Sequence, residues 1–304
     1  MDPTNRRGLF GAGAAAALPA LALALDTTPT RAREVDPELP GHWTALLNLL
    51  GRHDMMFGPR DVLDSVRSEL GVIAEHRRAA RGELRVALMR VEACWSEFGS
   101  WLAHDCGDRR GRNVLLDRAL HLAREAGYAD MIAWAQARRA QWSDAPSALR
   151  VAEAGLRTPH AGAHARAMCG VRAAHAYACI GDAESAARSI AEAEHLAALE
   201  SPPLPPPDAG MTDLLVRRWE ARCWAALKPA KAIGMYDAIL RVQPRDWTRE
   251  RGLYLAYLAN ACAHTGELDR ARAEGAKALA IAKQTRSTTA ARELKQLGAM
   301  LRAA

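Results

Sequence analysis

Apolar residues recur at helical spacing along most of the chain. Over residues 59–78 the spacing is four, four and three, which places the apolar side chains on one face of a helix. These residues are Val62, Val66, Leu70 and Ile73. A similar pattern predicts a longer helix over residues 84–106, and Gly82 marks the turn between the two. A short helix is expected over residues 43–50, ended by Gly51 and a loop over residues 53–58.

Residues 166–199 are predicted to form two short helices around a turn. Gly181 and Asp182 separate the helices, because glycine readily takes the left-handed conformation that ends a helix. Small residues lie where the helices must approach closely: Ala173, Ala174, Ala186 and Ala193. One such hairpin cannot bury its own apolar stripe, so we expect it to stack on similar hairpins.

Turns of this kind recur at nearly regular intervals. They begin at Gly107, Ser143, Gly181, Leu227 and Gly266. Gly107 and Gly181 lie 74 positions apart, twice 37, which is close to the period of about 34 of a tetratricopeptide repeat. The wider interval before Leu227 is explained by an insertion over residues 201–207, predicted to be a stiff, proline-rich surface loop. A final helix over residues 287–302, with Ser287 as its N-cap, is expected to cap the stack.

Four segments, residues 107–120, 181–196, 227–244 and 266–282, resemble tetratricopeptide units. Several motifs are also similar to the C-terminal repeat domain of actinobacterial helix-turn-helix regulators of the Cro/repressor-like (XRE) class. They are His53-Asp54 with Phe57-Gly58-Pro59-Arg60, Trp95-x-x-Phe98-x-x-Trp101-Leu102, Asp105-x-Gly107-Asp108 and Asp117-Arg118-Ala119-Leu120. The resemblance covers residues 40–304. It implies an all-α fold, a right-handed α-solenoid of helical hairpins with a C-terminal capping helix, occupying residues 36–304.

Such regulators carry a DNA-binding helix-turn-helix ahead of the repeats. Here about 35 residues precede the repeats, too few for that module, so no direct DNA binding is expected from this chain alone. Two explanations stay open: the chain is a sensor half standing alone, or its true start lies upstream.

Residues 1–35 differ from the rest. Arg6 and Arg7 precede an uncharged apolar run over residues 9–25, which resembles a twin-arginine export signal. The run is shorter than the roughly 20 residues of a membrane span and contains Pro19, so no stable span is expected. In the regulators a similar segment links two domains internally. We therefore expect a cytoplasmic protein with a signal-like or disordered N-terminal segment, and export with removal of residues 1–24 is the alternative.

The amino-acid composition also bears on the fold class and on the kind of partner. Aromatic residues are 5% of the chain and hydrophobic residues 49%, a mixture that suits close-packed helices. The net charge of +6 comes mainly from arginines that occur in pairs: Arg77-Arg78, Arg109-Arg110, Arg138-Arg139 and Arg217-Arg218. We interpret these pairs as solvated helix faces rather than a nucleic-acid surface. The six cysteines form no Cys-x-x-Cys pair and are interpreted as small buried thiols.

The sequence contains no Gly-x-Gly-x-x-Gly, Walker, Gly-x-Ser-x-Gly or His-Glu-x-x-His motif. His160 and His164 are four apart, but Pro159 and Gly162 place them at a turn, which argues against a metal site. His104, Asp105 and Cys106 are helix neighbours and point in different directions. We therefore predict no enzyme activity, no catalytic residue, no cofactor and no metal.

The inner wall of the stack is the better candidate site, because the first helix of each hairpin lines a concave groove in such folds. The residues expected there are Trp101, His104, Asp105, Trp134, Arg172, His175, Arg218, Trp224, Tyr257, Asn260 and His264. Rings could cover side chains, Asn260 could pair with an amide, and Arg172 or Arg218 could hold a carboxylate, as a bound peptide or protein segment requires. Trp101 and Trp134 could instead belong to the core. Arg172 and Arg218 are expected to be more exposed than His175. A homodimer stays open as a further partner.

Overall fold

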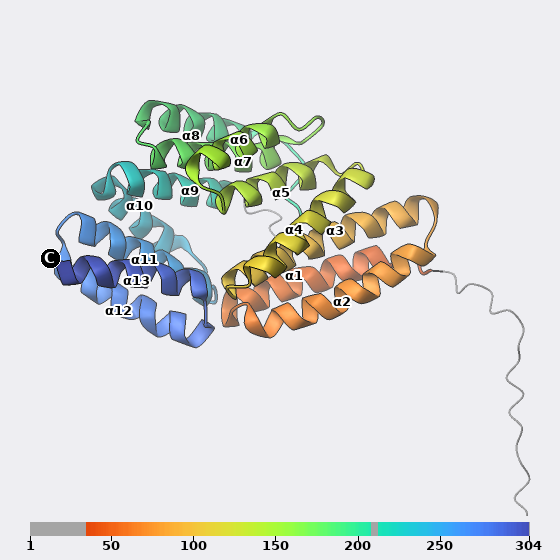
Figure 1. The fold of residues 1–304 in the computed structure, drawn as a ribbon, viewed down its shortest axis with the longest axis horizontal. Helices are drawn as coiled ribbons and strands as arrows, with labels where there is room; N and C mark the ends of the chain where they lie inside the picture. The colour runs from red at the N-terminus through yellow and green to blue at the C-terminus, as the bar shows by residue number, and fades with distance from the viewer. Residues whose placement is uncertain (1–34, 208–211, 304) are drawn as a thin grey trace, which may run out of the picture. The chain divides into compact units, whose positions relative to one another are not determined.

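Helices account for nearly all of the structure. A computed structural model describes residues 35–207 and 212–303, and these residues form thirteen helices and no strand (Figure 1). The prediction of an all-α fold is confirmed for this part of the chain. The helices are α1 (Leu39–Phe57), α2 (Arg60–Ala79), α3 (Gly82–Asp105), α4 (Arg109–Glu125), α5 (Ala129–Gln141), α6 (Ala145–Leu156), α7 (Ala163–Cys179), α8 (Ala183–Ala198), α9 (Thr212–Leu227), α10 (Pro229–Val242), α11 (Thr248–His264), α12 (Leu268–Thr285) and α13 (Thr288–Ala303).

Local signals at the turns explain most helix boundaries. Gly107, Gly181 and Gly266 have φ angles of 84°, 83° and 83°, the left-handed conformation that favours glycine. The aspartates Asp108, Asp144 and Asp182 then cap α4, α6 and α8 by accepting a hydrogen bond from the backbone N–H three residues further on, at 2.8–3.0 Å. The predicted turns lie where the periodicity placed them. Ser287 Oγ likewise accepts from the backbone N–H of Ala290 at 3.2 Å, which confirms it as the N-cap of α13.

Small residues let consecutive helices approach closely. Helices α3 and α4, α7 and α8, and α11 and α12 form the most extensive neighbouring pairs. A methyl group added at Gly170 of α7 would lie 3.1 Å from Ala193 Cβ of α8, so the two backbones are nearly in contact. The alanines predicted at this crossing, Ala173, Ala174, Ala186 and Ala193, are all buried. First helices of successive pairs also touch, since α7 packs against both α5 and α9.

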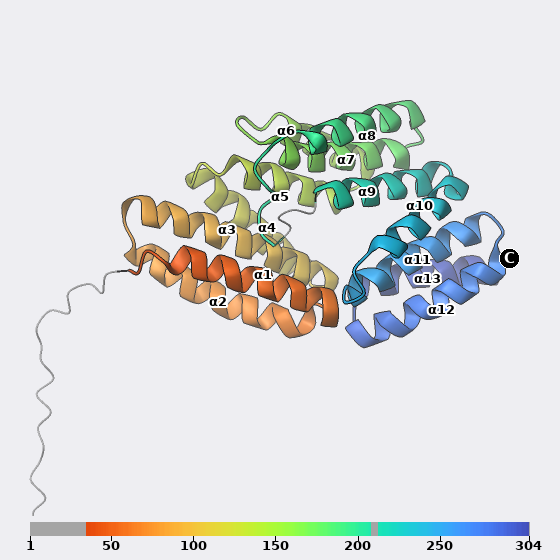
Figure 2. The same ribbon diagram turned by 180° about the vertical axis from the view of Figure 1, so that it is seen from behind.

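Helices near the two ends of the described region also meet. Helix α1 packs against α11 and α12, and α3 contacts α13 (Figures 1 and 2). All these helices belong to the compact unit that begins at Val35. The odd-numbered helices α1 to α11 surround a shared interior.

Two sequence-based expectations are wrong, and both fail for the same reason. Helix α1 continues through Gly51 to Phe57 instead of ending at residue 50. The proline-rich segment after α8 is not a surface loop throughout, because Leu204 is 1% exposed. A Cβ at Gly51 would lie 2.6 Å from Pro207 Cβ, so this segment packs directly on α1. Gly51 thus serves a close approach within a helix rather than a helix end.

The cysteines follow the prediction only in part. Cys94, Cys169, Cys223 and Cys262 are buried, but Cys179 is exposed and Cys106 is half-buried. Cys179 and Cys106 lie at the C-terminal ends of α7 and α3, where the side chains are less covered than in the middle of the helices.

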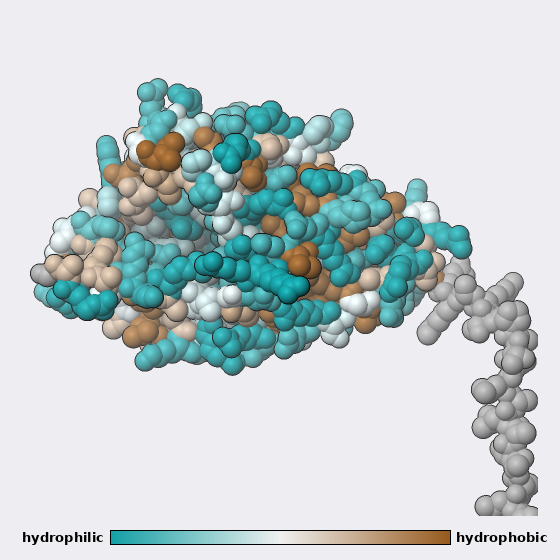
Figure 3. Space-filling view, in the orientation of Figure 1, coloured by the Kyte–Doolittle hydropathy of each residue, from teal (hydrophilic) through white to brown (hydrophobic). Residues whose placement is uncertain are grey.

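The predicted N-terminal signal-like segment lies outside the described residues. Within them, no helix combines the length and apolarity needed to cross a bilayer. On the face shown in Figure 3 the surface is mostly polar, with apolar patches scattered between polar side chains.

Candidate functional site

A cavity lies among the odd-numbered helices and is called here the interior cavity. The space open to the centres of water molecules inside it is about 140 Å³. One water needs about 10–15 Å³ on this measure, so the cavity could hold several waters or part of an organic ligand. Its wall contains six arginines: Arg52, Arg138, Arg172, Arg218, Arg222 and Arg249. Six of its aromatic residues are Trp101, Trp134, Trp219, Trp247, Tyr254 and Tyr257.

Helical spacing explains why these side chains share one interior. Residues three or four positions apart lie on the same face of a helix. Trp134, Arg138 and Gln141 follow this spacing on α5, and Arg218 and Arg222 follow it on α9. On α11 the same rule aligns Glu250, Tyr254 and Tyr257, so each helix presents one functional stripe.

The guanidinium groups lie against the aromatic rings. Arg172 Cζ is 3.5 Å from the centroid of the Trp219 ring, and Arg222 Cζ is 4.6 Å from the same ring. Arg218 Cζ is 4.7 Å from the centroid of Tyr254. Such contacts stabilise the cation and leave its N–H groups able to donate hydrogen bonds in the plane of the guanidinium.

Three of the wall arginines are paired with buried carboxylates. Arg138 Nε lies 2.6 Å from Glu97 Oε1, and Arg218 Nη1 lies 3.0 Å from Glu250 Oε2. Arg249 lies 2.8 Å from Asp54 and 3.1 Å from Glu250. These pairs are fixed parts of the wall, because a buried charge is stable only with its partner.

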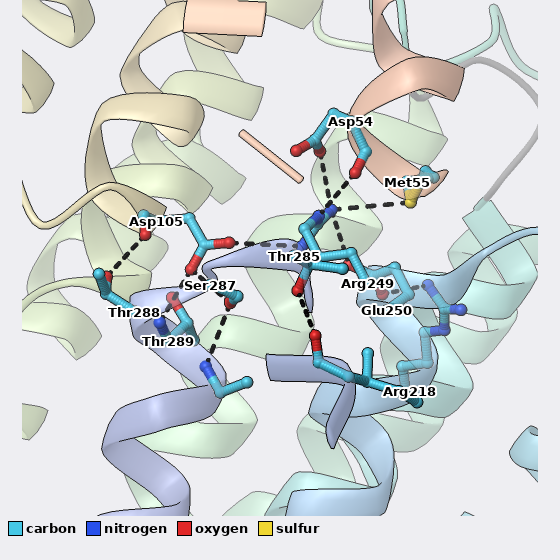
Figure 4. Close-up of polar contacts among 12 residues, drawn as sticks. Asp54, Met55, Asp105, Arg218, Arg249, Glu250, Thr285, Ser287, Thr288 and Thr289 are labelled. Carbon is cyan, nitrogen blue, oxygen red and sulfur yellow. Dashed lines mark hydrogen bonds and ion pairs between the residues drawn. The ribbon is translucent and has the colours of Figure 1, made fainter. Parts of the chain in front are cut away.

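Arg249 belongs to a polar cluster that joins distant helices (Figure 4). We call Asp54, Asp105, Arg249, Glu250 and Ser287 the Arg249 cluster. Arg249 Nη1 is 3.9 Å from Asp105, whose Oδ1 accepts from Ser287 Oγ and from the backbone N–H of Thr289, both at 2.8 Å. Burial raises the pKa of Asp54 to about 6, although the positive charge of Arg249 opposes the shift. The cluster connects α1, α3 and α11 with the start of α13.

Arg172 differs from these paired arginines. Its Nε donates to the Ala137 carbonyl and its Nη2 to Gln141 Oε1, both at 3.2 Å, and no described carboxylate lies within ion-pair distance. Burial, and then the positive charges of Arg138 and Arg222, lower the pKa of Arg172. The guanidinium therefore carries a charge that the described protein groups do not balance.

Five of the residues predicted for the groove line the interior cavity: Trp101, Trp134, Arg172, Arg218 and Tyr257. Tyr257 also borders an adjacent pocket together with three further predicted residues, His175, Asn260 and His264. There, Asn260 donates to the Glu293 carbonyl at 3.2 Å and carboxylate at 3.3 Å. Burial, and then the positive charge of Arg222, lower the pKa of His175 to about 3, so its ring is neutral near pH 7.

The other three predicted residues lie elsewhere. Asp105 is part of the Arg249 cluster. The ring of His104 stacks on Trp142 at 4.9 Å, and burial lowers its pKa to about 4. Trp224 donates through Nε1 to Glu220 and lies under Lys231, whose Nζ is 3.4 Å from the ring centroid. None of these three lines the interior cavity.

The expected order of exposure is wrong. Arg172 and Arg218 are 4% and 1% exposed, and His175 is only half-buried. Aromatic rings cover both guanidinium groups, a contact that the sequence does not reveal. Arg138 and Arg218 also depart from the interpretation of the arginine pairs as solvated faces, because each is buried in the cavity wall.

Several wall residues were missed: Arg138, Trp219, Arg222, Trp247, Arg249 and Tyr254. The predicted residues cover each inward helix face only in part. Extending the same face by three or four positions would have found Arg138 from Trp134, Arg222 from Arg218 and Tyr254 from Tyr257.

A scan against protein-family models and a search of curated proteins both return no match. In residues 35–207 and 212–303, no three or more His, Cys, Asp or Glu side chains are grouped so as to hold a metal ion.

Proposed function

We propose that this chain is a non-enzymatic regulatory scaffold that binds a peptide or protein segment in the interior cavity. The observation that carries the proposal is the convergence of arginine and aromatic side chains from α3, α5, α7, α9 and α11 on one interior. A peptide end presents apolar side chains and a carboxylate. Aromatic rings supply contact area for the side chains, and guanidinium groups bind the carboxylate.

We also propose that the helical pairs form a right-handed superhelix of the tetratricopeptide type. The Gly107, Gly181 and Gly266 turns, and the contacts of α7 with both α5 and α9, support this arrangement. Because α1 packs against α11, the proposed site suits a short end of a chain better than a long extended stretch.

A link to transcriptional regulation rests on the resemblance of residues 40–304 to the sensor domains of XRE-class regulators. In this proposal the chain senses its ligand and does not itself bind DNA. The burial of Arg138, Arg172 and Arg218 supports this division, because these positive charges are withdrawn from the surface that a nucleic acid would contact.

Peptide binding by the wild type and by Trp101→Ala and Arg172→Ala tests the proposal. Arg188→Ala is the matched control, because Arg188 is exposed on α8 and pairs only with neighbouring Glu184 and Ser185. We expect the two cavity variants to lose ligands that the wild type and control retain. Cavity variants that fold and still bind every ligand would contradict the site.

Export through a twin-arginine signal is the second candidate, favoured by Arg6 and Arg7 ahead of the apolar run. The intact mass of the protein from its native cell distinguishes the two. A mature chain beginning near Leu25 would support export, and an uncleaved cytosolic chain would reject it.

A further inference from the structure

The interior cavity presents more unpaired donors than acceptors. Among the buried polar atoms of its lining residues, four donors have no hydrogen-bond partner in the described structure: Arg172 Nη1, Arg218 Nε, Arg218 Nη2 and Trp134 Nε1. Asp54 Oδ1 is the one acceptor in this set. Each of these side chains is at least 96% buried, so an unmet donor there is costly. The preferred occupant is therefore a group rich in acceptors.

The charge balance leads to the same conclusion. Arg218 shares its charge with Glu250, whereas Arg172 has no carboxylate partner among the described residues. Two further arginines, Arg138 and Arg222, are close enough to destabilise its charged form. A single bound anion would balance Arg172 and relieve this repulsion.

The guanidinium groups converge rather than spread along the wall. Arg222 Cζ lies 4.6 Å from the centroid of the Trp219 ring and 4.7 Å from that of Tyr257. The rings of Tyr257 and Tyr254 are 5.7 Å apart, and Arg218 Cζ is 4.7 Å from the centroid of Tyr254. Trp219, which follows Arg218 in the chain, stacks on Arg172 at 3.5 Å. The unpaired donors of Arg172 and Arg218 thus lie around one part of the cavity, beside Trp219 and Tyr254.

We infer that the interior cavity binds an organic carboxylate, with the carboxylate held by Arg172 and Arg218 and the apolar body lying against the surrounding aromatic rings. The inference rests on the proposed function, because it assigns the chemistry of the ligand of the same cavity. The guanidinium fork matches the two oxygens of a carboxylate, and the negative charge would balance the charge of Arg172. Trp134 Nε1 is a further donor within the wall.

Two sources present this chemistry: a small aryl acid and the free C-terminus of a peptide. Calorimetric titration of the full chain separates them. One arm uses benzoate, 3-phenylpropanoate and indole-3-acetate, each beside its primary amide. The other uses tetrapeptides ending in phenylalanine or leucine, each with a free and an amidated C-terminus. Acid and amide have nearly the same shape, so their difference isolates the carboxylate.

We expect at least one acid, small or peptidic, to bind ten-fold or more tightly than its amide, and Arg172→Met to abolish that preference. Arg188→Met should preserve it, and circular dichroism verifies that both variants are folded. Arg172→Lys should recover part of the preference, because it restores the charge without the fork. No acid binding better than its amide, or an unchanged preference in Arg172→Met, would overturn the inference.

The two arms also separate this inference from the proposed function. Peptides that bind equally with free and amidated ends would uphold peptide binding and overturn the carboxylate assignment. Small acids that bind better than their amides, while no peptide binds, would support the carboxylate assignment and reject the peptide function.

Discussion

At the scale of single residues, the cavity wall combines balanced and unbalanced buried charges. Arg138 is held by Glu97 at 2.6 Å, whereas Arg172 is held only by a carbonyl and an amide oxygen. The two arginines lie in the same cavity and are nearly equally buried. Their difference in partners therefore predicts opposite effects of the same substitution.

Arg172→Met should raise the free energy of unfolding by about 1 kcal/mol, because an apolar side chain replaces a buried charge without a carboxylate partner. Arg138→Met should lower it by about 3–5 kcal/mol, because Glu97 would stay buried without its partner. Urea denaturation of both variants and the wild type measures the two changes. Losses of similar size in both variants would show that Arg172 is as well balanced as Arg138.

Asp54 predicts a pH effect at the same scale. Its pKa in the folded protein is about 6, above the ordinary value of 3.8, so between these values the folded state binds a proton that the unfolded chain has released. The contribution of Asp54 to the free energy of unfolding therefore falls as pH rises from about 4 to about 6. Asp54→Asn removes this titration, so the variant should gain about 1–3 kcal/mol relative to the wild type between pH 4 and pH 7.

Urea denaturation of the wild type and Asp54→Asn at pH 4 and pH 7 measures this change in the difference between their free energies of unfolding. A relative gain in the opposite direction would mean that Arg249 outweighs burial and depresses the pKa of Asp54. Glu69→Gln on α2 is a suitable control, because its carboxylate lies outside the Arg249 cluster and receives a hydrogen bond from Trp43.

At the scale of helices, most of the fold could be predicted from the sequence, because the signals that end and begin these helices are local. Gly181 and Asp182 stop α7 and start α8 through contacts within a few residues. Helix α1 was predicted too short because the role of Gly51 depends on Pro207, which is distant in sequence. Ser287 shows both kinds of contact, since it caps α13 locally and bonds Asp105 of α3.

Ser287→Ala should lower the free energy of unfolding by about 1–2 kcal/mol, because both the cap of α13 and the buried hydrogen bond to Asp105 are lost. Ser68→Ala on the exposed surface of α2 is the control and should change stability by less than about 0.5 kcal/mol. Thermal denaturation followed by circular dichroism measures both. Equal stability of the two variants would show that Ser287 contributes nothing at this junction.

At the scale of the whole described region, the contacts of α1 with α11 and α12 bring its two ends together beside the cavity. Arg249 of α11 contacts Asp54 of α1, 195 positions away. Five of the predicted residues do line the cavity, because the first helix of each pair faces inward as expected. The sequence could not reveal the burial of Arg172 and Arg218, because the rings that cover them, Trp219 and Tyr254, come from other helices.

Arg249→Met should lower the free energy of unfolding by about 3–5 kcal/mol, because Asp54, Asp105 and Glu250 would be left buried without their shared cation. Amide exchange should increase first in α1 and near residues 285–290, where the Arg249 cluster holds the two ends together. Arg270→Met is the control, because its pair with Asp237 is half-exposed and should contribute no more than about 1 kcal/mol. Uniform exchange across all helices would contradict the role of the cluster as a junction.

The most direct test of the account is a crystal structure of the full chain with the acid that shows the largest preference over its amide. We expect the carboxylate within hydrogen-bonding distance of Arg172 and Arg218, with the body of the ligand against the rings of the interior cavity. A carboxylate bound outside this cavity, or one inside it that contacts neither arginine, would contradict the account.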